Sequence, residues 1–272
     1  MRKRQSHLLP PPYLLLLSSA TRQSCSVWLK NRVQSCYVFD GATRRSDLSP
    51  VPDTDRVELR ANVLPLLAAA PSRNITVQLA ATLKTIISHD FPDQWPNLLA
   101  EIKRKLNSND IREVHAGCVA TVETVRAFRF VFFCFTSGIS VFTLASHRFR
   151  QNTEIRPHIV SELFPTLVSI ASRMIQTPPS SAQEIPTMLH LIIKAYKTSI
   201  SSELSPHQQS AESIVPWGQL LFNVVNLSLP REAVPEDEEE REDCEWWKVK
   251  KWSYAVLGAL FHRCVPYTRI YT

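Results

Sequence analysis

Residues 77–106 read VQLAATLKTIISHDFPDQWPNLLAEIKRKL, and this stretch decides the fold class. It carries two apolar stripes, Leu79, Leu83, Ile86 and Ile87 in the first and Trp95, Leu98, Leu99, Ile102 and Leu106 in the second. Apolar residues spaced by three or four positions lie on one face of an α-helix. Between the stripes, the Asp and Pro residues of DFPDQWP are typical of a turn. The stretch therefore predicts two amphipathic helices joined by a short turn.

The same pattern continues along most of the chain, starting at about Arg56. Further apolar stripes at helical spacing occupy Leu59–Leu67, Val114–Phe128, Val160–Met174, Ile185–Tyr196, Trp217–Leu227 and Trp246–Leu260. Helix pairs that recur at roughly forty residues are typical of HEAT and armadillo repeats, in which each pair buries one face against its neighbours. We therefore expect an all-α fold, an α-solenoid of HEAT-type helical hairpins with a poorly ordered N-terminal segment. A conventional helical bundle fits the periodicity as well.

The net charge of +6 does not indicate a nucleic-acid-binding surface. Much of the positive excess lies in the poorly patterned N-terminal part, and an acidic run from Glu236 to Asp243 follows later in the chain. A nucleic-acid-binding face needs a sustained row of basic residues, which this distribution does not provide. We expect no direct contact with nucleic acid.

The sequence also lacks the patterns of enzymes and metal proteins. Its six cysteines form no CxxC pair, which favours reduced structural thiols over a metal site. Its five glycines form no phosphate-binding loop, and the His89-Asp90 pair has no accompanying nucleophile motif. We expect no catalytic activity, no metal and no cofactor.

Two apolar segments stand apart from the helical pattern. Met1 to Ala20 imitates a secretory signal, but Pro10 to Pro12 interrupt its apolar region, and we interpret residues 1–25 as an atypical leader. Phe130 to Ser146 carries no charge and has strand-like composition. This second segment interrupts the helical pattern, so we interpret residues 130–149 as an insertion derived from a retained intron, with a membrane helix as the alternative.

The intron hypothesis makes a prediction about the messenger RNA. Removal of the codons for Val131 to Phe149 joins RAFRF directly to RQNTEIRP and restores a continuous polar sequence. We expect sequencing of the mature transcript to show that these codons are absent. Their presence, together with carbonate-resistant association of the protein with membranes, would favour the membrane helix instead.

Three stretches together resemble importin-β-type karyopherins. Residues 27–33, VWLKNRV, are similar to the YLKN helix of that family, and the VQL and HDFPDQWP segments of residues 77–96 are similar to its VQL…HDFPxxWP pattern. The acidic run followed by WWKVKKW at residues 246–252 resembles the importin seven/eight subgroup. Members of this family are several times longer, so the resemblance implies an N-terminal fragment.

The resemblance implies an organisation of the chain. We expect an atypical leader at 1–25, importin-like repeats at 26–129, the apolar insertion at 130–149, further HEAT-like repeats at 150–230, an acidic loop at 231–245, a HEAT-like helix at 246–263 and an atypical tail at 264–272. It also implies a nuclear import receptor that moves between cytoplasm and nucleus through the nuclear pore. Its partners would be the GTPase Ran in its GTP form, cargo proteins with basic segments, and pore proteins.

Candidate partner-binding residues follow from the same resemblance. Family members contact Ran through inner-face helices of the first repeats, here near Arg56–Ala69 and Pro96–Leu106. The outward-facing candidates on these helices are Glu58, Asn62, Glu101 and Lys105. The candidates for attracting basic cargo are Glu236, Asp237, Glu238, Glu239, Glu240, Glu242 and Asp243, unless that run is only a solvated linker. The rival functions are a helical scaffold without a transport role and a non-functional truncated product.

Overall fold

The computed structural model describes residues 18–37, 49–128, 141–176, 184–201, 204–229 and 233–264, with only the helical backbone given for 141–153. All regular elements in these ranges are helices, which confirms the predicted all-α class. The chain divides into two compact units, residues 1–127 and 128–272. Residues 1–17, 129–140 and 265–272, on which several sequence-based expectations fall, lie outside the described ranges.

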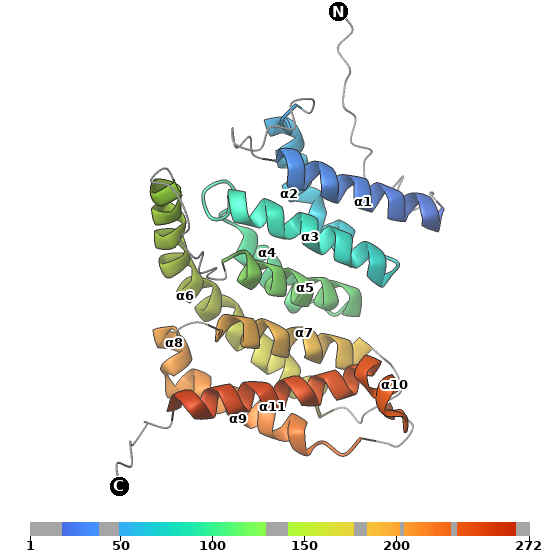
Figure 1. Cartoon of the computed structure of the whole chain (residues 1–272), viewed down its shortest axis with the longest axis vertical. Helices are drawn as coiled ribbons and strands as arrows, with labels where there is room; N and C mark the ends of the chain where they lie inside the picture. Colours follow the sequence, from blue (N-terminus) through green and yellow to red (C-terminus); the bar gives the residue numbers. More distant parts are fainter. Residues whose placement is uncertain are drawn as a thin grey trace, which may run out of the picture. The chain divides into compact units, whose positions relative to one another are not determined.

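The first unit is built from two layers of helices. Its elements are α1 (Ser19–Cys36), α2 (Asp53–Ala68), α3 (Arg73–Asp90), α4 (Leu98–Leu106) and α5 (Ile111–Ala127). Helices α1, α3 and α5 lie side by side in one row (Figure 1). Helix α2 packs against α3 and α5, and α4 packs against α5. This arrangement is that of stacked helical hairpins, as the periodicity predicts.

The second unit repeats this plan. Its elements are α6 (Val141–Met174), α7 (Glu184–Ser199), α8 (Pro206–Gln209), α9 (Ala211–Asn226), α10 (Glu238–Asp243) and α11 (Glu245–Cys264). Helices α7 and α11 lie side by side (Figure 1), while α6 packs against α7 and α9. Helix α9 also contacts α11, and the short α10 contacts the start of α11.

Helix α6 reaches into the segment that the sequence suggested as an insertion. It begins at Val141 and continues without a break to Met174, so residues 141–149 are helical although their composition is strand-like. Strand propensity depends strongly on context, and a helical neighbourhood overrides it. Among the described residues, no helix is both long and apolar enough to cross a bilayer.

The predicted apolar stripes form the two cores. Every residue of the stripes in 79–87 and 98–106 is buried, and so is Trp95 in the turn between them. In the second unit, the rings of Tyr196 and Trp217 stack with their centroids 4.1 Å apart, and the Phe164 ring lies 5.8 Å from that of Trp217. Large aromatic rings in such offset contacts contribute more than their buried area alone.

A buried carboxylate ties together three helices of the first unit. The Tyr37 hydroxyl, just after α1, donates a hydrogen bond to Asp90 Oδ2 at 2.5 Å, and Arg60 Nη1 of α2 lies 2.5 Å from the same oxygen. The Asp90 side chain is at the end of α3 and only about 5% exposed. Burial, and then the bond to Asp90, raise the pKa of Tyr37 well above its ordinary value, so its hydroxyl remains a donor. The Arg56 guanidinium lies 5.0 Å from the centroid of the Tyr37 ring and covers the cluster.

Replacement of Asp90 tests the importance of this cluster. We expect Asp90→Ala to lower the free energy of unfolding of the first unit by about 3–5 kcal/mol, because it leaves the Arg60 charge and the Tyr37 hydroxyl without their acceptor in a buried site. Tyr37→Phe, which keeps the ion pair, should cost about 1 kcal/mol. Hydrogen exchange of the α1–α3 amides measures both effects.

The exposed Asp93, three residues further along the chain, provides the matched control. Asp93→Ala should change the stability by less than about 0.5 kcal/mol, as is usual for surface positions. An Asp90→Ala chain with the same exchange rates as Asp93→Ala would show that the cluster does not hold the three helices together.

Candidate protein-binding surfaces

The outward face of α2 carries apolar side chains together with two exposed acidic ones, Asp53 at the start of the helix and Glu58. Glu58 is exposed, next to Val57, which is 56% exposed. Asn62 is half-buried, and its Nδ2 donates to the Glu58 carbonyl oxygen at 2.8 Å. The Asn62 side-chain amide therefore already bonds to its own helix. Of the two candidate Ran-binding residues on α2, Glu58 is the one whose side chain a partner can reach.

On α4 the structure corrects one predicted position. Lys105 is not outward-facing: it is only 3% exposed, and its Nζ forms an ion pair with Glu113 of α5. Lys105 comes three residues after Ile102 and seven after Leu98, so it lies on the buried face of the helix. Arg104, one position earlier, is the exposed cation of this helix.

Glu101 occupies an intermediate position on α4. Its side chain is half-buried, and its Oε1 accepts a hydrogen bond from Trp95 Nε1 at 3.4 Å. This contact links α4 to the buried Trp95 ring of the preceding turn. Glu101 therefore stabilises the turn before α4 and is also partly exposed on the surface.

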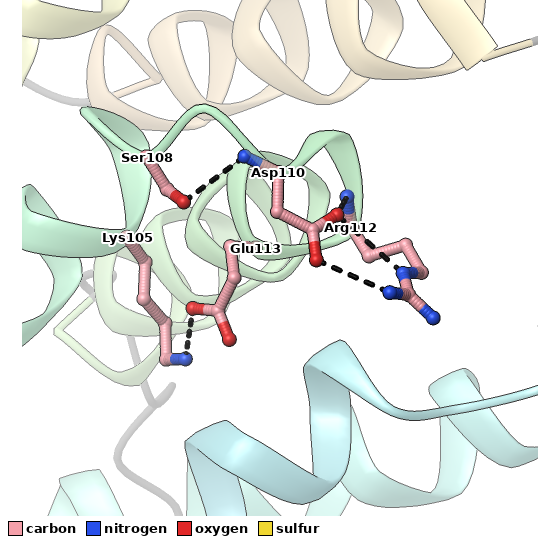
Figure 2. Close-up of polar contacts among 5 residues, drawn as sticks. All are labelled: Lys105, Ser108, Asp110, Arg112 and Glu113. Carbon is pink, nitrogen blue, oxygen red and sulfur yellow. Dashed lines mark hydrogen bonds and ion pairs between the residues drawn. The ribbon is translucent and has the colours of Figure 1, made fainter.

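Figure 2 shows how the turn between α4 and α5 is fixed. Ser108 Oγ accepts a hydrogen bond from the Asp110 amide at 3.1 Å, and Asp110 Oδ1 accepts one from the Arg112 amide at 2.9 Å. The second bond satisfies a free N–H group at the start of α5. It is also the main cause that lowers the pKa of Asp110, with the Arg112 side chain adding to it. Together with the Lys105–Glu113 ion pair, these bonds fix the angle at which α5 leaves α4.

The acidic run is partly helical rather than a loop. Glu238–Asp243 forms α10, none of whose residues is buried. Asp237 caps this helix, because its Oδ1 accepts a hydrogen bond from the Glu239 amide at 3.0 Å. Arg241 Nε and Nη2 donate to the carbonyl oxygens of Pro235 and Glu236 at 2.8 and 2.6 Å. Acidic residues in the first turn are also stabilised by the positive end of the helix dipole. These contacts together explain why this charged run forms a helix.

The two ends of the acidic run have different electrostatic surroundings. Towards α11, Glu242 lies 3.9 Å from Lys251 Nζ, and Asp243 lies 3.9 Å from Lys248 Nζ. Glu238, Glu239 and Glu240 are exposed, and within the described part of the chain their carboxylates form no ion pair. These three carboxylates, which we call the acidic patch, and the exposed Glu236 are therefore the part of the run that forms no ion pair with the described residues.

Aromatic and charged contacts anchor the helix that follows the acidic run. Trp246 of α11 is buried, and the Lys197 ammonium of α7 lies 4.1 Å from the centroid of the Trp252 ring. Glu245 Oε2 lies 2.8 Å from His190 Nδ1, also on α7. Burial lowers the pKa of His190 in spite of this carboxylate, and the pKa of Glu245 is lowered because the contacts with His190 and Lys248 outweigh its own burial. The acidic patch is thus attached to a firmly packed helix.

No site for a metal ion or a reactive thiol stands out in the residues that the structure describes. No three His, Cys, Asp or Glu side chains come together there as metal ligands would. Cys118 is fully buried, and burial raises its pKa to about 12, so it is not a thiolate at neutral pH.

Comparisons with known proteins find importins and exportins. No family model matches the chain. It is 22% identical over 244 residues to importin-8 of Homo sapiens, 27% identical over 246 residues to the importin beta-like SAD2 homolog of Arabidopsis thaliana, and 24% identical over 249 residues to a probable importin-7 homolog of Dictyostelium discoideum. These alignments cover 89%, 90% and 91% of this chain but 22%, 21% and 21% of the relatives. The chain thus spans about a fifth of the length of the curated relatives it matches.

A solved structure supports the same architecture. The exportin Cse1 in its cargo-free, cytoplasmic state aligns with a TM-score of 0.64 over 89% of this chain and 24% of its own, at 17% identity. This likeness confirms the predicted α-solenoid fold. The relatives are transport proteins rather than enzymes, which confirms the expectation that the chain is not an enzyme.

The burial of His190 beside Glu245 predicts a pH dependence of stability in the second unit. The folded pKa of His190 lies below its unfolded value of about 6.5, so the unfolded chain binds more protons as the pH falls and the folded state loses stability. The lowered pKa of Glu245 adds to this loss at still lower pH. We expect the protection factors of the α7 and α11 amides, which correct the exchange rates for the intrinsic pH dependence of amide exchange, to fall on acidification from about pH 7 to about pH 5.

His190→Gln should flatten this pH dependence, because glutamine does not titrate. His158→Gln, which changes an exposed histidine of the same unit, should leave it as in the original chain. An unchanged pH profile in His190→Gln would assign the acid sensitivity to other groups.

Proposed function

From the confirmed resemblance to importin-β-family receptors of the importin-7/8 type, we propose that this chain is the part of a nuclear transport receptor that engages Ran-GTP and basic cargo. The observation that carries this proposal is the similarity to three importin-7/8-type relatives over about nine-tenths of the chain. The stacked hairpins of both units suit such a role, since an α-solenoid offers long surfaces for protein partners. The receptor would act in the cytoplasm and the nucleus and pass through the nuclear pore.

We place the Ran-binding surface on α2 and α4. Both helices lie outside the row formed by α1, α3 and α5, so a partner can approach them without displacing that row. Glu58 and Arg104 provide exposed charges of opposite sign there. Asn62 and Glu101 are secondary contacts because both are half-buried, and Lys105 is excluded because its ammonium is paired inside the unit.

We place the cargo-binding surface on the acidic patch, Glu238 to Glu240. Its three carboxylates are exposed on one short helix, so they attract a lysine-rich segment over a range of about 8–10 Å at physiological salt. Glu236, Asp237, Glu242 and Asp243 add to this field, although the last two are already close to lysines of α11. Binding through such a patch is expected to weaken steeply as salt increases.

Release of cargo would follow from a negative coupling between the two ligands. If Ran-GTP and cargo favour different curvatures of the solenoid, each ligand lowers the affinity of the other by the same factor. Typical couplings of 1–3 kcal/mol correspond to roughly 5–150-fold changes in affinity. Such a coupling distinguishes a transport receptor from a scaffold, which has no reason to respond to the nucleotide on Ran.

The test measures binding of purified Ran and of a lysine-rich peptide to the full 272-residue chain. We expect Ran loaded with a non-hydrolysable GTP analogue to bind, and Ran-GDP to bind at least about tenfold more weakly. The double variant Glu58→Lys with Arg104→Glu should weaken Ran binding by about tenfold, and Glu238→Gln, Glu239→Gln and Glu240→Gln together should weaken peptide binding by a similar factor.

Each variant serves as a control for the other, because we expect the first to spare peptide binding and the second to spare Ran binding. A further matched control replaces three exposed glutamates elsewhere in the second unit, Glu154→Gln, Glu184→Gln and Glu212→Gln, and should affect neither ligand. Equal binding of both nucleotide forms of Ran would favour a scaffold, and loss of peptide binding in the control would show that overall charge rather than the acidic patch attracts the peptide.

A further inference from the structure

Helix α4 is too short to fix its own orientation. It has nine residues, Leu98–Leu106, and helices of this length are not stable in water without tertiary contacts. Its main packing partner among the described helices is α5. The direction in which the outward side chains of α4 point is therefore set by the contacts of α4 with α5.

The two helices approach each other closely at Gly117 of α5. A Cβ atom added at this glycine would lie 2.9 Å from Leu106 Cδ2 and 3.1 Å from the Leu106 backbone nitrogen. A larger residue would force the Leu106 side chain or the helices to shift, so glycine allows the last turn of α4 to lie close against α5. Lys105 directly precedes Leu106, and Glu113 lies one helical turn before Gly117. The close approach therefore brings the charges of Lys105 and Glu113 together inside the hairpin.

The two partners of this ion pair are buried to different degrees. The Lys105 side chain is 3% exposed and that of Glu113 is 30% exposed, and Figure 2 shows the Glu113 carboxylate facing Lys105 Nζ. Burial of an ammonium group without a partner is costly, so Lys105 points inward because the Glu113 carboxylate is there. Without this carboxylate, the long lysine side chain would be more stable with its ammonium turned towards water.

The inward position of Lys105 determines where its neighbours on α4 point. Successive residues of an α-helix are about 100° apart, so a rotation that brings Lys105 towards the surface turns the exposed Arg104 away by the same angle. Glu101 lies three residues before Arg104, on the same face, and would turn with it. The buried leucines and isoleucine of α4 limit this rotation, but apolar contacts have little directionality. Within that limit, the ion pair selects one orientation of the helix.

From these contacts we infer that Glu113 is a positioning residue for the surface of α4 that we propose to bind Ran. It acts through Lys105: the carboxylate holds the Lys105 ammonium inside the α4–α5 hairpin and thereby keeps Arg104 and Glu101 on the face that a partner meets. The consequence for binding rests on the proposed function. The inward position of Lys105 is a property of the hairpin alone, so it can be measured without a partner.

A double-mutant cycle on the full chain tests the inference, with Ran loaded with a non-hydrolysable GTP analogue as the ligand. We expect Glu113→Gln to weaken binding by about fivefold, a size typical of residues that act on a site without touching the ligand. Lys105→Met should change binding by less than about twofold, because methionine fills the site without a charge that needs a partner. The double variant should bind as Lys105→Met does, because no ammonium is left for residue 113 to hold.

Glu123→Gln is the matched control for this cycle. It removes a carboxylate from the same helix and breaks its ion pair with Arg126, which is also on α5, so the contact between α4 and α5 stays intact. We expect unchanged Ran binding, and circular dichroism checks that each variant keeps its helices. An equal loss of binding in Glu123→Gln and Glu113→Gln would overturn the inference by showing general destabilisation. An equal loss on Glu113→Gln with and without Lys105→Met would overturn it as well, by showing that Glu113 does not act through Lys105.

Chemical modification of lysines tests the inward position of Lys105 in the absence of Ran. With an amine-acetylating reagent and mass spectrometry, we expect Lys105 to react at least about tenfold more slowly than the exposed Lys84 of α3, and Glu113→Gln to remove most of this difference. Equal reaction rates of Lys105 and Lys84 in the original chain would overturn the inference. The expected modification pattern in a chain that binds neither nucleotide form of Ran would disprove the proposed function, while still showing that Glu113 sets the orientation of α4.

Discussion

The packing of the first unit depends on one buried carboxylate, which accepts hydrogen bonds from side chains of two other elements at once. Asp90 stands at the end of α3, and the Tyr37 hydroxyl and the Arg60 guanidinium both reach the same oxygen from the end of α1 and from α2. Hydrophobic packing alone allows helices to slide or rotate, because apolar contacts have little directionality. A buried, hydrogen-bonded ion pair has a fixed geometry, and removing one partner destabilises the fold because the other charge is left buried without compensation. The pair therefore sets the angle and register of α2 and α3. The positions of the exposed faces of α2 and α4 therefore depend on the Asp90 cluster.

The second unit is ordered by a different combination of forces. Stacked rings of Tyr196 and Trp217 hold α7 against α9, and the contacts of Glu245 and Trp252 with α7 hold α11 in place. Arg241 and Asp237 then order the short acidic helix that precedes α11. The consequence for function is that the carboxylates of the acidic patch are presented on an anchored element. Binding to an ordered helix costs this chain less conformational freedom than binding through a flexible tail would.

The positions of charged residues decide which of them can take part in recognition. Lys105 and Glu113 neutralise each other between α4 and α5, whereas Arg104, next in sequence to Lys105, remains exposed. A similar division runs through the acidic run, where lysines of α11 lie near Glu242 and Asp243 but not near the acidic patch. Charges that are already paired lose part of their attraction for a partner, so the surface available for recognition is smaller than the number of charged residues implies.

The sequence by itself determined the helical class, the residues of the core and the turns, because these follow from local spacing. The stripes of residues 79–106 are buried as their periodicity requires, and the motifs in 77–96 and 246–252 led to the same family as the comparisons with whole proteins. The inward position of Lys105 was also present in its spacing from Leu98, but a lysine is not expected in a core, and its partner Glu113 lies on another helix. Only the tertiary structure decided that Tyr37, Arg60 and Asp90 meet and that Glu238–Asp243 forms a helix. The physical reason is that the Asp90 cluster joins residues 30 and 53 positions apart, and that the acidic helix depends on specific side-chain bonds of Asp237 and Arg241, neither of which the apolar spacing contains.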